Sequence, residues 1–164
     1  MKIVEPKNAH VFMATEKNFN KLGRFFTKQF NEYTQGWPMS QRVHELRVIT
    51  KELKWTLEND KATLLFLEND AKEIKGVIIV HDDGADTGSV MYAYLDKDIR
   101  HSKAGAYLFY VALCQVLGGM KLLLDRDDNI YVGKRVEDQR EDLGFQVIHP
   151  NVCIALRRIF ERPD

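Results

Sequence analysis

The chain has 164 residues, of which 24 are basic and 24 acidic, so its formal net charge at pH 7 is zero. A balanced charge gives no global attraction to nucleic acid or to an anionic membrane, and no apolar run approaches the roughly 20 residues needed to span a bilayer. The first residues also lack the apolar stretch of a signal peptide. We therefore expect a soluble, cytoplasmic protein that forms one domain over residues 1–164.

The first half of the chain predicts a strand, two helices and a hairpin. A strand over residues 10–14 leads to Thr15, a suitable N-cap for the first helix, and Ser40 suits the N-cap of the second. Apolar runs over 63–67 and 74–80, separated by polar residues, predict the hairpin. Apolar side chains at helical spacing mark one face of each helix: Phe19, Leu22, Phe26, Phe30 and Tyr33, then Val43, Leu46, Ile49, Leu53 and Leu57.

The centre of the chain passes from a strand through a basic turn into an apolar helix. Residues 90–95 are β-branched, aromatic and apolar, residues 100–106 form the turn, and the helix follows over 107–117. The first amides of a helix have no acceptor within the helix and attract anions. Because Arg100 and Lys103 add positive charge, the turn is a candidate phosphate site.

The last part of the chain predicts a strand, a helix and a closing hairpin. Residues 121–125 indicate a short buried strand. Apolar positions over 131–143 recur at helical spacing, and Gly144 suits the C-cap of that helix. The hairpin is expected from residues 145–148 and 152–156.

The order of these elements and two short motifs resemble the GNAT superfamily of N-acetyltransferases. The acyl-CoA turn of that family reads Arg/Gln-x-x-Gly-x-Gly/Ala. Arg100 matches its first position, Gly105 matches the second glycine, and Lys103 stands where the first glycine is expected. Leu143-Gly144-Phe145 is similar to the Leu-Gly-Phe signature that follows the last helix of the family. The resemblance implies an α/β (α+β) fold with a mixed, mostly antiparallel central sheet and helices on both faces.

The resemblance also implies transfer of an acetyl group from acetyl-CoA to an amine of a small molecule or a protein. Amides of the turn are then expected to hold the pyrophosphate, and the edge of the preceding strand to pair with the pantetheine amides. A lysine at position 103 is strained if the backbone there needs a positive φ. The residues expected to bind the cofactor are Tyr94, Leu95, Asp96, Arg100, Ser102, Lys103, Ala104, Gly105 and Ala106.

The acid and base of the family are not at their usual positions. Ser89 stands where histone-acetylating members carry a glutamate base, and Arg140 where many members carry a tyrosine acid. Tyr131 is the substitute acid and Asp125 the substitute base, directly or through water. The alternatives are core packing for Tyr131 and turn capping for Asp125. The missing groups leave a second hypothesis, a catalytically silent GNAT-fold domain that binds acyl-CoA or a protein partner.

Neither a metal site nor a disulfide is expected. Cys114 and Cys153 lie in apolar segments far apart, and the five histidines have no metal-ligand spacing. The acceptor cannot be identified from the sequence, although the acidic residues in loop 82–86 suit a cationic amine, with solvated surface as the alternative. A homodimer is left open.

Overall fold

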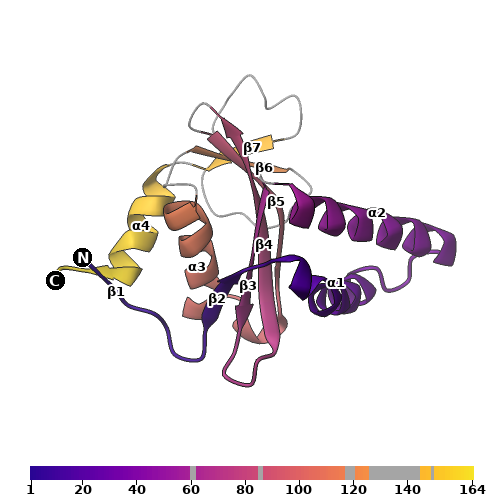
Figure 1. The fold of residues 1–164 in the computed structure, drawn as a ribbon, viewed down its shortest axis with the longest axis horizontal. Helices are drawn as coiled ribbons and strands as arrows, with labels where there is room; N and C mark the ends of the chain where they lie inside the picture. The colour runs from indigo at the N-terminus through magenta and orange to yellow at the C-terminus, as the bar shows by residue number, and fades with distance from the viewer. Residues whose placement is uncertain (60–61, 85–86, 117–120, 126–144, 149) are drawn as a thin grey trace.

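The computed structural model describes residues 1–59, 62–84, 87–116, 121–125, 145–148 and 150–164. Its α-helices are α1 (Phe19–Tyr33), α2 (Met39–Glu58), α3 (Lys103–Tyr110) and α4 (Pro150–Phe160). The strands of its main sheet are β2 (His10–Met13), β3 (Ala62–Glu68), β4 (Ile74–Gly84), β5 (Thr87–Leu95), β6 (Lys121–Asp125) and β7 (Phe145–Ile148). Figure 1 shows α1 and α2 on one face of this sheet and α3 and α4 on the other.

The main sheet has six strands in the order β2-β3-β4-β5-β6-β7. Every neighbouring pair is antiparallel except β5 and β6, which are parallel. A parallel pair needs a crossover, and α3 lies in that connection. The expected mixed, mostly antiparallel sheet with helices on both faces is therefore confirmed.

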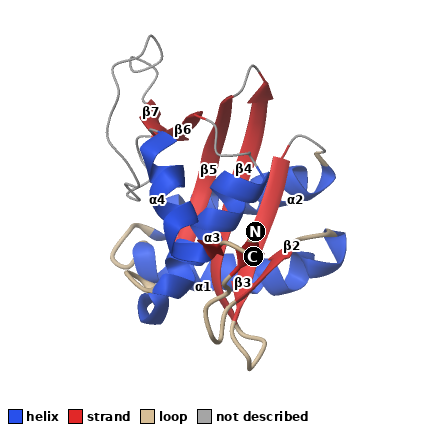
Figure 2. Ribbon diagram, turned by 90° about the vertical axis from the view of Figure 1, so that its left-hand side faces the viewer, coloured by secondary structure: helices blue, strands red, loops and turns tan. Residues whose placement is uncertain are grey.

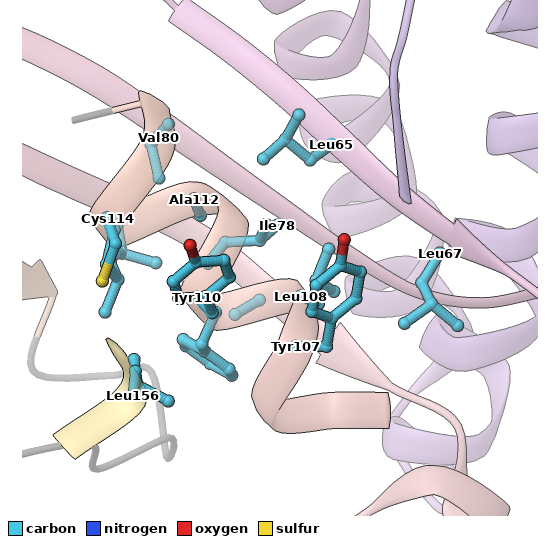
Figure 3. Close-up of a cluster of buried hydrophobic side chains, with 14 of the residues drawn as sticks. Leu65, Leu67, Ile78, Val80, Tyr107, Leu108, Tyr110, Ala112, Cys114 and Leu156 are labelled. Carbon is cyan, nitrogen blue, oxygen red and sulfur yellow. The ribbon is translucent and has the colours of Figure 1, made fainter. Parts of the chain in front are cut away.

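Side chains alternate between the two faces of the sheet and build two separate cores. Leu64 and Ile79 point to the face of α1 and α2, where they pack with Leu22 of α1. Their neighbours Leu65 and Ile78 point to the other face and pack with side chains of α3 (Figure 3). All of these side chains are at most 2% exposed, and burying one of them contributes about 1.5–3 kcal/mol. Because successive side chains of a strand point to opposite faces, the apolar runs of β3 and β4 contribute to both cores.

The two N-terminal helices begin differently from each other. Thr15 is the N-cap of a 3-10 turn, Glu16–Asn18, that leads into α1, and its backbone N–H donates to the Asn18 side chain at 2.9 Å. The second helix begins one residue before Ser40, so the prediction of Ser40 as its N-cap is wrong. Pro38 holds that position: its ψ of 141° is extended, and its carbonyl accepts the first helical hydrogen bond from Arg42 N at 3.0 Å.

The C-terminal segment departs from the prediction more strongly. Residues 152–156 were expected as the closing strand, but they lie within α4, and Cys153 is therefore in a helix. A short run of apolar residues does not distinguish strand from helix by its period. Here Pro150 occupies the first helical position, where its missing N–H costs nothing, and Leu156 and Phe160, four residues apart, are both buried against α3.

The two ends of the chain pair with each other in a second, two-stranded sheet. Strand β1 (Lys2–Ile3) is antiparallel to β8 (Glu161–Arg162), and Val4 N donates to Phe160 O at 2.7 Å. Figure 2 shows the two termini side by side near α3. The predicted helix over 131–143 and Leu143-Gly144 lie outside the described residues.

Candidate functional site

The central strand β5 leaves its neighbour β6 halfway along its length. Residues 87–90 of β5 pair with 121–124 of β6, whereas the register of β5 with β4 continues to Leu95. Residues 91–95 therefore have β4 on one side and, within the described part of the chain, no strand on the other. The sheet opens at this point, and one edge of β5 is free to pair with an extended ligand.

A β-bulge lies at the same point. Ile79 of β4 pairs with Tyr92, and the next residue, Val80, pairs with Val90, so Met91 is the extra residue. The bulge explains why Val90 and Ala93, three residues apart, both face the core under α3. Bulges bend and twist a strand, which accounts for the divergence of β5 from β6 just beyond Val90.

The backbone groups of β5 alternate between β4 and the opening. Asp96 N donates to Lys75 O at 2.8 Å, so the backbone of Asp96 is directed at β4. By the alternation of an antiparallel ladder, the backbone N–H and C=O of Tyr94 also point to β4. Those of Ala93 and Leu95 point to the opening instead. Of the three strand residues expected to pair with pantetheine, only Leu95 has the right orientation. Ala93 shares it and was missed, because the register of β4 with β5 cannot be read from the sequence.

The Tyr94 side chain points to the face of the sheet that α1 and α2 cover. Its ring packs edge-on against Phe26 of α1, with the two ring centres 5.6 Å apart. Tyr94 is therefore directed at α1 rather than at α3.

Carboxylates and lysines fix the turn that follows β5. The Asp96 side chain accepts from Asp98 N at 3.4 Å and caps a 3-10 helix at Lys97–Ile99. Lys75 Nζ donates to Asp98 at 2.8 Å, and Lys28 Nζ lies 3.7 Å from the Asp96 carboxylate. Hydrogen bonding with Asp96 and then with Lys75 keeps the pKa of Asp98 below its ordinary value, and the same bond to Asp98 raises the pKa of Lys75.

Ser102 is the N-cap of α3, which begins directly at Lys103. Its Oγ accepts from Gly105 N at 3.3 Å, and its carbonyl accepts from Ala106 N at 3.1 Å. The amides of Lys103 and Ala104 have no acceptor within the described residues. Among the candidate turn amides, these two are thus available to an anion, together with the positive end of the helix dipole.

The positive φ in this turn falls on His101, at 60°, and not on Lys103. Lys103 has helical backbone geometry as the first residue of α3, so the expected strain of a lysine at this position does not arise. Histidine visits the left-handed region more often than most residues, although the conformation still costs about 1 kcal/mol.

Gly105 is needed for packing rather than for a turn. A Cβ on this residue would lie 3.0 Å from Ile99 O and 3.1 Å from Leu95 Cδ1. Without the Cβ, the first turn of α3 can lie directly against the end of β5. Gly105 is buried, so its α-carbon faces the protein interior.

Exposed basic side chains surround the first turn of α3. The side chains of Arg100, His101 and Lys103 are all exposed. Arg100 Nε donates to the carbonyl oxygen of Leu95 at 3.0 Å, across the turn. The turn therefore combines two available amides, a helix N-terminus and exposed positive charge beside the open edge of β5.

The residues assigned to acid and base catalysis are only partly placed. Asp125 is the last residue of β6, one beyond Leu124, which pairs with Val90 at the start of the opening. Its backbone therefore lies at the mouth of the opening. Ser89 lies in the half of β5 that pairs with both neighbours. Tyr131 and Arg140 are outside the described residues.

The described residues contain neither a cluster of metal-ligating side chains nor a helix that could span a membrane. No three His, Cys, Asp or Glu side chains among them gather as a metal site. None of the described helices is long and apolar enough to cross a bilayer. The Cys114 side chain is buried in the π-helical segment Val111–Val116, which continues α3 (Figure 3).

Comparison with solved structures places this architecture in a known fold. The PaiA N-acetyltransferase of Thermoplasma acidophilum, solved in complex with coenzyme A, matches with a TM-score of 0.61 and 16% identity, covering 85% of this chain and 96% of its own. A GNAT-family acetyltransferase of Staphylococcus aureus Mu50 matches with a TM-score of 0.52 and 15% identity, over 71% and 73% of the two chains.

A third match is the ribosomal-protein-alanine N-acetyltransferase of Brucella melitensis biovar Abortus 2308, with a TM-score of 0.50 and 15% identity over 71% and 78% of the two chains. No protein-family model matches the sequence, and no curated protein matches it. The similarity is therefore one of structure, and the chain has the GNAT fold.

Proposed function

We propose that this protein is an N-acetyltransferase that transfers an acetyl group from acetyl-CoA to an amine of a small molecule or a protein. The observation that carries the proposal is the open edge of β5 next to the cationic first turn of α3. A GNAT fold alone does not establish an activity, but this pair of features matches the two chemically different halves of coenzyme A.

The cofactor fits the turn in three respects. The amides of Lys103 and Ala104 are available to the pyrophosphate, Arg100 and Lys103 add charge, and Ser102 keeps the helix end in place. The pantetheine arm contains two amides, and the N–H and C=O groups of Ala93 and Leu95 are directed at the opening where that arm would lie. Asp96, Tyr94, Gly105 and Ala106 support this arrangement through the bonds and packing given above.

Acetyl transfer requires one proton to leave the acceptor and one to reach the thiolate. The amine nitrogen attacks the thioester carbon, the C–S bond breaks, and the sulfur leaves with the electron pair. Asp125, at the mouth of the opening, is the proposed base for the ammonium proton. Tyr131 is the proposed acid that returns a proton to the sulfur. A single domain over residues 1–164 and a cytoplasmic location stay part of the proposal.

The second candidate is a catalytically silent domain that binds acyl-CoA or a protein partner. The observation that favours it is Ser89, a residue without a carboxylate at the position of the family's base. Binding and catalysis therefore need separate tests.

The binding test uses the amide of Lys103. Proline is favoured at the first helical position and has no N–H, and the extended backbone of Ser102 (φ −107°, ψ 166°) tolerates a following proline. Lys103→Pro removes the amide and the charge, while the matched control Lys103→Ala removes only the charge. We expect calorimetry to show acetyl-CoA binding to the parent, and binding to Lys103→Pro that is weaker than to Lys103→Ala by about tenfold.

The absence of any acetyl-CoA binding by the parent would overturn the cofactor assignment. Equal affinity of the two variants would show that the Lys103 amide does not contact the phosphates.

The catalytic test follows release of CoA thiol with a broad panel of amines and peptides. Asp125→Asn and Tyr131→Phe should each lower kcat by about 10²-fold, while acetyl-CoA still binds. Unchanged turnover in both variants would show that the acid and base are elsewhere. If acetyl-CoA binds and no amine in the panel is acetylated, the silent domain becomes the better description.

A further inference from the structure

The carbonyl of Leu95 is one of the backbone groups that β5 presents to the opening. It is also the group to which Arg100 Nε donates, at 3.0 Å. A side chain from the turn thus takes the place that an N–H of an extended ligand would take on a free strand edge. A carbonyl oxygen can accept two hydrogen bonds, but the second bond is weaker when the first donor is a cation.

Among the described residues, no carboxylate forms an ion pair with Arg100 that would hold it in this position. The two acidic residues of the turn are paired with lysines instead, because Asp98 accepts from Lys75 and Asp96 lies 3.7 Å from Lys28. The side chain of Arg100 is exposed, and within the described part of the chain its one hydrogen bond is the bond to Leu95 O. A single hydrogen bond to a neutral carbonyl is weaker than the bidentate contact that a guanidinium makes with a phosphate.

On the basis of the proposed function, we infer that Arg100 determines specificity for the donor thioester by competing for the Leu95 carbonyl. A donor that carries the diphosphate of coenzyme A draws the guanidinium away from Leu95 and leaves the carbonyl to the pantetheine arm. A thioester of pantetheine without phosphate offers the guanidinium no such contact, so its amide must compete with Arg100. Arg100 therefore strengthens the binding of a thioester that carries the diphosphate and weakens the binding of a thioester of pantetheine alone.

The test compares two ligands on two variants. Arg100→Ala removes both the charge and the contact with Leu95, and the control Lys103→Ala removes a neighbouring charge but makes no contact with that carbonyl. Binding of acetyl-CoA and of S-acetylpantetheine is measured by calorimetry and by ligand-observed NMR. The melting temperature of each variant without ligand confirms that it is folded.

We expect changes of opposite sign in Arg100→Ala. Its affinity for acetyl-CoA should fall by about tenfold, whereas its affinity for S-acetylpantetheine should rise by about threefold or more. In Lys103→Ala, acetyl-CoA should bind more weakly and S-acetylpantetheine as it does to the parent.

Weaker or unchanged binding of S-acetylpantetheine to Arg100→Ala would overturn the inference, even with acetyl-CoA binding intact. If neither ligand binds the parent, the proposed cofactor site fails and this role of Arg100 fails with it. The two failures are distinguished by the acetyl-CoA measurement on the parent.

Discussion

The two faces of the sheet are covered by helices of different origin. On one face, α1 and α2 follow each other in the chain, and their core combines Leu22, Phe25 and Phe26 with strand residues. On the other face, α3 comes from the middle of the chain and α4 from its end, and the paired termini lie beside them (Figures 1 and 2). Only the second face carries the turn proposed to bind acetyl-CoA. Helix α3, which begins at this turn, therefore packs against segments from the end of the chain.

The face of α3 and α4 also contains polar contacts within an aromatic cluster. The rings of Tyr107, Tyr110 and Phe160 pack with centres 5.2–6.0 Å apart. Tyr110 OH donates to Glu161 at 2.9 Å, and burial, together with the Glu5 carboxylate, raises the pKa of Tyr107. Both carboxylates belong to the terminal segments, and the hydrogen bond of Tyr110 joins α3 to the C-terminal strand β8. The following experiments separate the contribution of this face from that of α1 and α2.

The largest expected effect comes from matched truncations of the two cores. Leu22 of α1 and Leu108 of α3 are both fully buried, so Leu22→Ala and Leu108→Ala should each lower the free energy of unfolding by about 2–5 kcal/mol. Only Leu108→Ala should also weaken acetyl-CoA binding, because Leu108 and Leu95 both lie against Gly76, below the start of the turn. Denaturant unfolding and calorimetry measure the two quantities, and equal loss of affinity in both variants would contradict the assignment of the cofactor to one face.

The second prediction concerns Tyr110, which contacts the C-terminal strand β8. Tyr110→Phe should lower the free energy of unfolding by about 1.5 kcal/mol, because Tyr110 loses a hydrogen bond to a charged, half-buried group. When Glu161 is replaced by Gln, Tyr110→Phe should lower the free energy of unfolding by less than it does in the parent. Additive effects of the two substitutions would show that the contact contributes little.

The two tyrosines Tyr107 and Tyr110 predict a loss of stability at high pH. Burial raises the pKa of Tyr107 and of Tyr110 to about 12, with further contributions from Glu5 and Glu161. A tyrosine in the unfolded chain has a pKa of about 10. The stabilisation is therefore fully present below pH 10 and is lost as the pH rises from about 10 to about 12. The double variant Tyr107→Phe/Tyr110→Phe should lose less stability over this interval than the parent, and parallel melting curves would contradict the prediction.

The smallest effect distinguishes two serines near helix starts. Ser102 caps α3 with its side chain, whereas Ser40 lies inside α2. Ser102→Ala should therefore lower the free energy of unfolding by about 1 kcal/mol, and Ser40→Ala should change it by less than about 0.5 kcal/mol. Comparing the urea midpoints of both variants measures the difference, and a larger effect at Ser40 would restore it as a capping residue.

The design of binding variants changes once the turn is seen in three dimensions. Gly105→Glu suggests itself from the motif as a way to place negative charge against the phosphates. In the structure the α-carbon of Gly105 faces Ile99 and Leu95, so this substitution would disturb the packing of α3 before it repelled a ligand. Lys103→Pro and Arg100→Ala act on groups that face outward.

Much of the fold follows from local sequence patterns. The apolar runs that form β3, β4 and β5 each identify a strand, because a short apolar run between polar residues is typical of a strand buried on both faces. The apolar face of α1 identifies a helix, because its side chains repeat with the helical period. The Arg100 to Gly105 motif likewise identifies the place where the helix starts, but the predicted boundary at residue 107 is wrong. Helix α3 begins at Lys103, because the Ser102 side chain caps it there.

Where local patterns are ambiguous, the predicted element or helix start is wrong. Residues 152–156 are apolar without a clear period, and only the contacts of Leu156 and Phe160 with α3 select the helix. At the start of α2, Ser40 has the better side chain for a cap, but the fixed φ of Pro38 sets the helix start.

The sequence by itself determined which segments are strands and helices over most of the described chain, and that a basic turn precedes α3. Tertiary structure decided which backbone groups of β5 face the opening, that Met91 is the bulged residue, and that the positive φ falls on His101. It also decided that the chain ends pair beside α3. The reason is physical: pairing register and helix packing depend on residues far apart in the chain, so no single segment contains the information that fixes them.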